Sequence, residues 1–282
     1  MPKVSVLTPL YNTNPQYLRE CIDSILNQTF TDFEFLILND SPDNKEIEKI
    51  VKSYKDKRIK YYKNEKNIGI SASRNKLLDL AKGEYIAIFD HDDISLPERL
   101  SQEVEYLDSH LDIGVVSSNL QYFPSNSITK HPTENLEIKK YLMFGMVVAH
   151  TAMMVRKSIL DKYNIRYEEA FSPAEDYMFV LRLVKYTMFH NIQHALVKYR
   201  FLDTNTTKKQ WDKMCNADSL CRDYALTQYP YLYSVALAQR PVAPIQYWVY
   251  IFDLIPVIRV KKRPHKDRWY LFGIIPVFAV RR

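Results

Sequence analysis

The sequence is poor in cysteine, in glycine and in long apolar runs. Its three cysteines, Cys21, Cys215 and Cys221, form neither an even set nor a CxxC pair, which argues against a disulfide framework and predicts reduced thiols in a cytosolic setting. None of the five glycines lies in TPLYNTNPQ, so this early segment has no glycine-rich phosphate loop. The apolar run IQYWVYIFDLIPVI has fourteen residues including Asp253. It is too short to span a bilayer, which takes about 20 residues.

Charge is distributed unevenly along the chain. The net charge is +6, yet the segment from residue 240 to the end carries nine Lys and Arg against two acidic residues. The body is therefore nearly neutral and the tail is basic, which predicts an anionic surface as a partner. The N-terminal MPKVSVLTPLYN runs straight into an apolar segment, so no signal peptide is expected before the fold.

Short apolar runs alternate with amphipathic segments in the first half of the chain, which predicts βαβ units and a mostly parallel sheet. Strands are expected at 4–10, 33–40, 58–64, 85–89, 113–120 and 151–155. Helices are expected at 15–26, 47–54, 71–81, 95–109, 172–185 and 207–229. Asn14 followed by Pro15 predicts an N-cap for the first helix. The sequences SLPE, from Ser95, and SPAE, from Ser172, predict capping boxes for two later helices.

Three acidic residues and a histidine follow the strand expected at 85–89, in the segment DHDD. A solvated helix start would account for Asp93 through the helix dipole but not for Asp90. An EF-hand loop needs glycine and glutamate where Ser95 and Ser101 stand, and a zinc site needs more histidine or cysteine. A hard divalent cation, Mg²⁺ or Mn²⁺, held by Asp90 and Asp92 and completed by a ligand's phosphates, suits this position best.

Four blocks in order, TPLYN, LNDSPD, NIGISASRNKLLDLAKGEYIAIFDHDD and SPAEDYMFVLRL, resemble the family 2 inverting glycosyltransferases of the bacterial surface-glycan type. The resemblance covers roughly residues 4–200. It implies the GT-A fold, a Rossmann-like α/β sheet flanked by helices, which uses a nucleotide-diphosphate sugar and a D-x-D metal motif. The domain is expected at 1–205, with a donor half at about 1–110 and an acceptor half at about 111–205. Residues 206–282 would form a helical and amphipathic extension.

The resemblance assigns candidate donor residues by position. Asp92 would hold the metal that bridges the diphosphate, and Asp90 the ribose or a metal-bound water. Pro9, Tyr11 and Asn12 match the loop that frames the nucleotide base. Asp40 matches the acid that hydrogen-bonds a uracil-like ring, although an ordinary turn aspartate is the alternative.

Arg74 and His150 complete the candidate donor set. Arg74 lies near the first turn of the helix at 71–81, where a cation opposes the dipole unless the diphosphate or an acidic-loop aspartate compensates it. A surface arginine is the alternative. His150 matches a position near the sugar pocket, although a lone histidine beside a strand is as often a packed one.

Inversion requires one carboxylate that takes the acceptor proton. Glu175 and Asp176 match the family's E-D pair, and Asp176 is the expected base because Glu175 has a structural role in the capping box. Many relatives carry a late histidine where this chain has Leu202, and Asp203, His194 or a water would replace it. The alternatives are a sugar-1-phosphate nucleotidyltransferase, which needs the missing glycine-rich loop, and a non-catalytic relative that binds nucleotide sugars.

The tail alternates aromatic-apolar runs with RVKKRPHKDR. Residues 245–282 would dock peripherally on anionic lipid. The protein is therefore expected in the cytoplasm, on the cytoplasmic face of the inner membrane. There it would extend a glycan or glycolipid acceptor such as lipopolysaccharide, lipooligosaccharide or capsule. A hairpin packed on the body is the alternative. No motif of a nucleic-acid-binding domain is present.

Overall fold

The computed structural model describes residues 1–201, 211–239, 245–251, 255–263, 266–271 and 275–281. Contacts divide the chain into two compact units, Met1–Tyr233 and Ser234–Arg282. Two of the late site candidates, Leu202 and Asp203, lie outside the described residues. Within the described residues, every helix is too short or too polar to cross a membrane.

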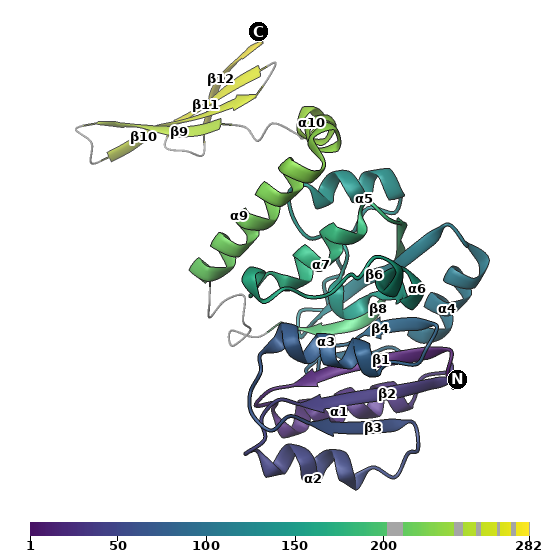
Figure 1. The fold of residues 1–282 in the computed structure, drawn as a ribbon. Coiled ribbons are helices and arrows are strands. Elements are labelled where there is room, and N and C mark those ends of the chain that lie inside the picture. The colour runs from purple at the N-terminus through teal and green to yellow at the C-terminus, as the bar shows by residue number, and fades with distance from the viewer. Residues whose placement is uncertain (202–210, 240–244, 252–254, 264–265, 272–274, 282) are drawn as a thin grey trace. The chain divides into compact units, whose positions relative to one another are not determined.

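The larger unit is a mixed α/β structure with an eight-stranded sheet flanked by helices (Figure 1). Its elements are, in chain order, β1 (Val4–Leu10), α1 (Pro15–Leu26), β2 (Phe33–Asn39), α2 (Lys45–Ser53), β3 (Ile59–Lys63), α3 (Ile70–Leu80), β4 (Tyr85–Ile88), β5 (Ile94–Ser95), α4 (Arg99–Ser109), β6 (Ile113–Phe123), α5 (Asn135–Leu142), η1 (His150–Ala152), β7 (Met154–Arg156), α6 (Lys157–Lys162), η2 (Glu169–Phe171), α7 (Glu175–Leu183), β8 (Met188–Arg200) and α9 (Trp211–Gln228). Helix α10 (Pro230–Gln239) crosses the boundary between the units.

The strand order is β3-β2-β1-β4-β7-β6-β8-β5. Strands β3, β2, β1 and β4 are mutually parallel, whereas β7 pairs antiparallel with both β4 and β6. Because parallel strands end at the same edge of a sheet, the loops after β1, β2 and β4 come together. The expected mostly parallel α/β sheet is confirmed.

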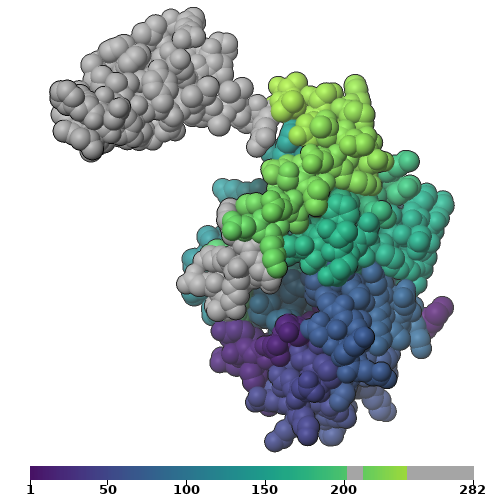
Figure 2. Space-filling model, turned by 60° about the vertical axis from the view of Figure 1, so that its left-hand side comes forward, coloured from purple at the N-terminus to yellow at the C-terminus, as the bar shows by residue number. Residues whose placement is uncertain are grey.

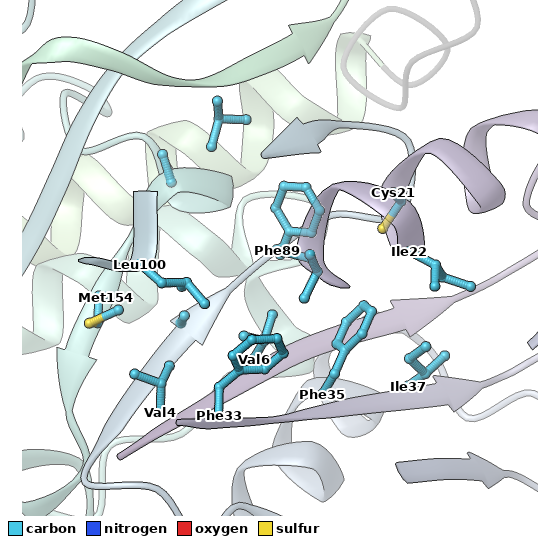
Figure 3. Packing of buried hydrophobic residues seen from close by; sticks show 14 of the residues in the cluster. Val4, Val6, Cys21, Ile22, Phe33, Phe35, Ile37, Phe89, Leu100 and Met154 are labelled. Carbon is cyan, nitrogen blue, oxygen red and sulfur yellow. The ribbon is translucent and has the colours of Figure 1, made fainter. Parts of the chain in front are cut away.

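The core explains why the sheet forms where the apolar runs predict it. Every residue of β1, β2 and β4 is buried, as expected for strands covered on both faces. Helices α1, α2 and α4 contribute the apolar side chains that complete one large cluster with these strands. Figure 3 shows Phe89 beside Cys21 and Ile22 of α1, with Phe35 and Val6 beneath them. Helix α3 packs on β1 and β2, so the residues after Phe89 begin at the rim of a rigid layer.

The predicted cap of the first helix is confirmed, because Asn14 Oδ1 accepts hydrogen bonds from the amides of Gln16 and Tyr17 at 2.9 and 3.4 Å. The predicted capping box at Ser95 is wrong. Ser95 pairs with β8 as a strand residue, and α4 begins only at Arg99. The side chain of Gln28 replaces the cap, since its Oε1 accepts from the amide of Leu100 at 3.0 Å.

The second predicted capping box is also wrong. Ser172 follows η2 and donates its amide to the carbonyl of Glu169 at 3.0 Å. Helix α7 begins three residues later at Glu175, after Ala174, and has no side-chain cap. The glutamate is therefore free of the capping role that the sequence suggested, which changes the interpretation of the acidic pair at this helix start.

The smaller unit contains the last turns of α10 and a four-stranded antiparallel sheet in the order β12-β11-β10-β9. Its strands are β9 (Ile245–Ile251), β10 (Ile255–Arg263), β11 (Lys266–Leu271) and β12 (Ile275–Arg281). The helical part of the expected extension is formed by α9 and α10, and the basic, aromatic part is a meander of neighbouring strands.

Candidate active site

The candidate site lies where β1, β2 and β4 end. The strands are in register, with Leu7 opposite Ile88 and Leu10 opposite Asn39. Two hydrogen bonds tie the following loops together: the amide of Asp40 donates to the carbonyl of Leu10 at 2.8 Å, and the amide of Asn12 donates to Ser41 Oγ at 2.7 Å. The fold thus brings the three predicted donor-binding segments to one edge of the sheet.

Arg74 connects the acidic loop to the predicted catalytic pair. Its Nη2 donates to Asp90 Oδ1 at 3.2 Å and its Nη1 donates to Glu175 Oε1 at 2.7 Å. Arg74 is 8% exposed, and its guanidinium lies over the ring of Tyr167, 5.3 Å from the centroid. The surface alternative for Arg74 is therefore wrong, and its compensating anions are one aspartate of the acidic loop and a glutamate that lies 101 residues later in the sequence.

The aspartates of the acidic loop differ in environment. Burial is the largest single influence and acts to raise the pKa of Asp90, but the charges of Arg74, His150 and His91 together hold the pKa below its ordinary value. Asp92 is half-buried, and burial together with the charge of Asp90 raises its pKa. Arg74 donates to Asp90 and Glu175, so the electrostatic cost of a second ionised carboxylate beside Asp90 is seen at Asp92.

Asp93 belongs to the framework of the loop rather than to a solvated helix start, so that expectation is wrong. It is 1% exposed and lies six residues before α4. Its Oδ2 accepts from Thr151 Oγ1 at 2.8 Å and its Oδ1 accepts from the amide of Arg200 at 2.9 Å. These two bonds fix the loop against η1 and the end of β8.

Arg200 holds the acidic loop from the other side, a role that the sequence interpretation missed. Its Nε donates to the carbonyl of Asp92 at 2.8 Å, its Nη2 pairs with Glu20 of α1, and its guanidinium lies 4.0 Å from the ring centroid of Tyr17. The signal was the Tyr-Arg pair at 199–200, next to the position where a histidine was sought. The backbone that carries Asp92 is thus clamped between β8 and α1.

The residues present fit a hard divalent cation that shares its coordination with a ligand. In the described part of the chain no three His, Cys, Asp or Glu side chains converge as a self-sufficient metal cage. Mg²⁺ characteristically takes one or two carboxylates and completes its shell with water and substrate phosphates. The raised pKa of Asp92 beside Asp90 is an electrostatic cost that a bound cation would remove. His194, a proposed substitute ligand, lies exposed in β8.

The two acidic residues at the start of α7, Glu175 and Asp176, have different surroundings. Glu175 is 5% exposed and is held by Arg74, while its Oε2 is buried with no hydrogen-bond partner among the described residues. Asp176 is half-buried, and its Oδ1 accepts from the amide of Tyr177 at 2.7 Å. Burial, followed by the charge of Glu175, raises the pKa of Asp176 to about 6. A carboxyl with this pKa can both accept and release a proton near neutral pH.

Asp40 is 3% exposed and organises the segment that precedes α3. Its Oδ1 accepts from Asn64 Nδ2 at 2.7 Å and from the amide of Ile68 at 3.0 Å, and its Oδ2 accepts from the amide of Gly69 at 3.0 Å. Gly69 has φ +84°, a conformation that glycine adopts without the strain of a side chain. Asp40 therefore shapes the loop at this edge, and Oδ2 retains capacity for one further donor.

The remaining candidates, Pro9, Tyr11, Asn12 and His150, differ in how far they are buried. Pro9 is a buried residue of β1, Tyr11 is 55% exposed, and Asn12 has φ 45°. His150 is buried and its Nε2 lies 2.9 Å from the hydroxyl of Tyr167. Burial, followed by the charge of Arg74, lowers the pKa of His150 to about 3, so its imidazole is neutral at physiological pH.

Comparisons with known proteins agree with this arrangement. The family model for glycosyl transferase family 2 matches residues 5–164. An uncharacterized glycosyltransferase of Methanocaldococcus jannaschii is 42% identical over 207 residues, covering 71% of each chain. An O-antigen biosynthesis glycosyltransferase of Escherichia coli is 31% identical over 236 residues, covering 80% of this chain and 88% of the relative.

A crystal structure of residues 1–349 of S. aureus TarS in complex with UDP-GlcNAc has a similar fold, with a TM-score of 0.69 at 21% identity over 83% of this chain and 71% of that one. The likeness confirms the expected GT-A fold. The family model covers more than half of the chain, and the two sequence relatives extend over most of it. This chain therefore belongs to glycosyl transferase family 2 and is a glycosyltransferase.

Proposed function

We propose that the protein transfers a sugar, with inversion, from a nucleotide-diphosphate donor to a hydroxyl group of a surface glycan. The observation that carries the proposal is the Arg74 bridge, which places the acidic loop after β4 and the acidic pair of α7 on the two sides of one guanidinium. A direct displacement needs a cationic group that stabilises the departing diphosphate, here a cation that the acidic loop would hold, and a carboxylate that accepts the proton of the acceptor.

Asp176 is the proposed base. The acceptor oxygen forms a bond to the anomeric carbon while the bond from that carbon to the diphosphate oxygen breaks, and the hydroxyl proton passes to the Asp176 carboxylate. The pKa of about 6 keeps this carboxylate ionised at neutral pH while leaving it basic enough to accept the proton. Glu175 and Arg74 hold the start of α7 against the acidic loop, so the base is oriented by groups that are themselves buried.

A divalent cation, Mn²⁺ or Mg²⁺, is the proposed cofactor, with Asp92 as its principal ligand and Asp90 as the second. When bound, it neutralises charge on the departing diphosphate. Asp93 and Arg200 keep the Asp92 backbone in place for this role. The donor-binding loop would be completed by Pro9, Tyr11 and Asn12, with Asp40 accepting the N3–H of a uracil ring.

A UDP-sugar is the proposed donor, which agrees with the UDP-GlcNAc bound to the similarly folded TarS. A glycan or glycolipid of the bacterial surface is the proposed acceptor, in keeping with the O-antigen enzyme among the relatives. We further propose the division into a donor half at about 1–110, an acceptor half at about 111–205 and an extension at 206–282.

The basic tail supports a peripheral membrane role. Residues 240–282 carry nine Lys and Arg against two acidic residues, and each such cation near an anionic surface contributes about 1 kcal/mol. We expect the protein to bind the cytoplasmic face of the inner membrane without crossing it. The protein should float with vesicles of phosphatidylglycerol but not with phosphatidylcholine vesicles, and 0.5 M salt should release it; equal binding to both kinds of vesicle would contradict this role.

A screen of nucleotide sugars for UDP release tests the enzymatic proposal. Release should require Mn²⁺ or Mg²⁺, should be restored after chelation by adding the metal back, and should rise when an acceptor glycolipid is present. Formation of a nucleotide sugar from a nucleoside triphosphate and a sugar phosphate would instead support the nucleotidyltransferase alternative. UDP binding without turnover of any donor would support a non-catalytic role.

A further inference from the structure

A cavity of about 480 Å³ lies outside the site described above. Its wall is formed by residues of α5, α7, α9 and α10 and by the segments that follow α6 and α7. Its polar and aromatic lining, here named the tyrosine–lysine pocket, includes Lys139, Tyr163, Arg182, Lys185, Tyr186 and Tyr224. This volume lies within the range of pockets that bind one small ligand. None of the residues proposed to bind the donor lines it, so the pocket needs a separate explanation.

The lining carries an excess of positive charge. Two lysines and an arginine line the pocket, and no Asp or Glu is among the lining residues. Arg182 Nε pairs with Glu168 Oε1 at 2.6 Å, but within the described residues neither Lys139 nor Lys185 has an ion-pair partner. Burial lowers the pKa of Lys139, which means that its surroundings disfavour the charged form until an anion compensates it.

Tyrosine rings provide the other half of the surface. The rings of Tyr163 and Tyr186 stack with their centroids 4.0 Å apart at 15°, and both residues are more than a third exposed. Across the pocket α9 contributes Tyr224, whose ring meets that of Tyr229 edge to face at 6.3 Å. Such rings offer apolar faces for the C–H surface of a sugar and hydroxyls for its polar rim. Helix α9 contacts α7, and Figure 2 shows the green residues of this part of the chain lying against the teal ones.

Helix α7 links this pocket to the proposed base. Asp176 lies in its first turn and Arg182 in its last, so the two positions are about 9 Å apart along the helix axis at 1.5 Å per residue. Six residues also turn the two side chains about 120° apart around the helix axis, so an acceptor chain of a few sugars must curve around α7 for its terminal hydroxyl to reach Asp176 while a more distant sugar occupies the pocket.

We propose that the tyrosine–lysine pocket binds an acidic sugar of the acceptor glycan, one that bears a carboxylate or a phosphate. This inference rests on the proposed function and adds the chemical class of the acceptor. The anion would lie between Lys139 and Lys185, with the sugar ring against the stacked tyrosines. The protein would thus select charged acceptor chains over neutral chains of the same length.

Binding to the full chain tests the pocket without any turnover. The probes are a tetramer of galacturonic acid, a neutral tetramer of galactose and inorganic phosphate, measured by calorimetry at low and at moderate salt. The variant K139Q/K185Q should weaken binding of the acidic tetramer about tenfold or more, and the control K49Q/K82Q, which removes two exposed lysines outside the pocket, should leave it unchanged. Tenfold corresponds to about 1.4 kcal/mol.

Three outcomes would overturn the inference: equal affinity for the neutral tetramer, equal loss in the control variant, or phosphate binding as tightly as the acidic tetramer, which would indicate a simple anion site. The test remains separate from the proposed function because D176N should lower the rate of transfer about a hundredfold or more while retaining tetramer binding, and K139Q/K185Q should retain metal-dependent UDP binding. Loss of UDP binding in the lysine variant would show a damaged fold, and the single variant K185Q, at an exposed lysine, then provides the test. It should weaken binding of the acidic tetramer severalfold, and unchanged binding would overturn the inference.

Discussion

Asp176→Asn provides the sharpest test of the active site, because it should damage catalysis while making the protein more stable. The raised pKa of Asp176, about 6 against 3.8, shows that the fold disfavours the charged carboxylate. One pKa unit equals 1.36 kcal/mol, so the full difference corresponds to about 3 kcal/mol. Because the side chain is half-buried rather than fully buried, we reduce this to about 1 kcal/mol.

The sign follows from proton linkage. A carboxyl whose folded pKa lies above its unfolded pKa contributes stability below the unfolded value, and that contribution is lost as the pH rises through the folded value. For Asp176 the loss occurs between about pH 4 and pH 6. Asn carries no charge, so D176N should unfold about 2–4 °C higher than the unchanged protein at pH 8 and at nearly the same temperature at pH 4.

The same substitution should lower the catalytic rate. Loss of a general base lowers kcat by about 10²–10⁴-fold, and donor binding should stay within about twofold, since Asp176 is not proposed to hold the diphosphate. In the unchanged enzyme, kcat/KM should fall below an apparent pKa of about 6. The matched control is D212N, which removes an exposed acidic residue from the first turn of α9. A D176N protein that is fully active, or one that is inactive and less stable, would refute the reasoning.

Three other substitutions test separate parts of the site. Asp92→Asn should lower the rate of UDP release about 10²–10³-fold and raise the Mn²⁺ concentration needed for half-maximal rate; a rate with unchanged metal dependence would remove Asp92 from the ligand set. Arg74→Met should lower the free energy of unfolding by about 3–5 kcal/mol at pH 7, because it leaves two carboxylates uncompensated. The loss should be smaller at pH 4, and denaturant titration at both pH values measures the difference. Gly69→Ala should cost about 1–2 kcal/mol through its positive φ alone, whereas Gly145→Ala, with open space around it, should be nearly neutral; equal costs would show that the backbone conformation is not the cause.

Features formed by residues close together in the sequence could be predicted, whereas contacts between residues far apart in the sequence could not. The cap at Asn14 was predicted because donor and acceptor lie within three residues of each other. The cap at Ser95 failed because pairing with Val197 of β8 competes for the same residue, and that partner is about a hundred positions away. Periodicity cannot reveal such a competitor.

The same distinction applies to the site. The acidic loop could be placed at a strand end because the apolar run before it is unambiguous. The second anion at Arg74, the clamp by Arg200 and the three bonds to Asp40 depend on contacts between distant segments. The tyrosine–lysine pocket draws on elements from α5 to α10, so no single stretch of sequence indicates it.

The long sequence span of the Arg74 bridge has a consequence for the nascent chain. Glu175 is made 101 residues after Arg74, which takes the ribosome about 5–20 s at normal rates of synthesis. Until Glu175 is made, Asp90 is the only one of the two anions of Arg74 that the nascent chain can contain, and α7 does not yet exist to provide the proposed base. A chain terminated before α7 would lack both the proposed base and Arg200, whose side chain donates to the carbonyl of Asp92. On the proposed mechanism, sugar transfer therefore requires that this late part of the chain be made and packed against the earlier strands.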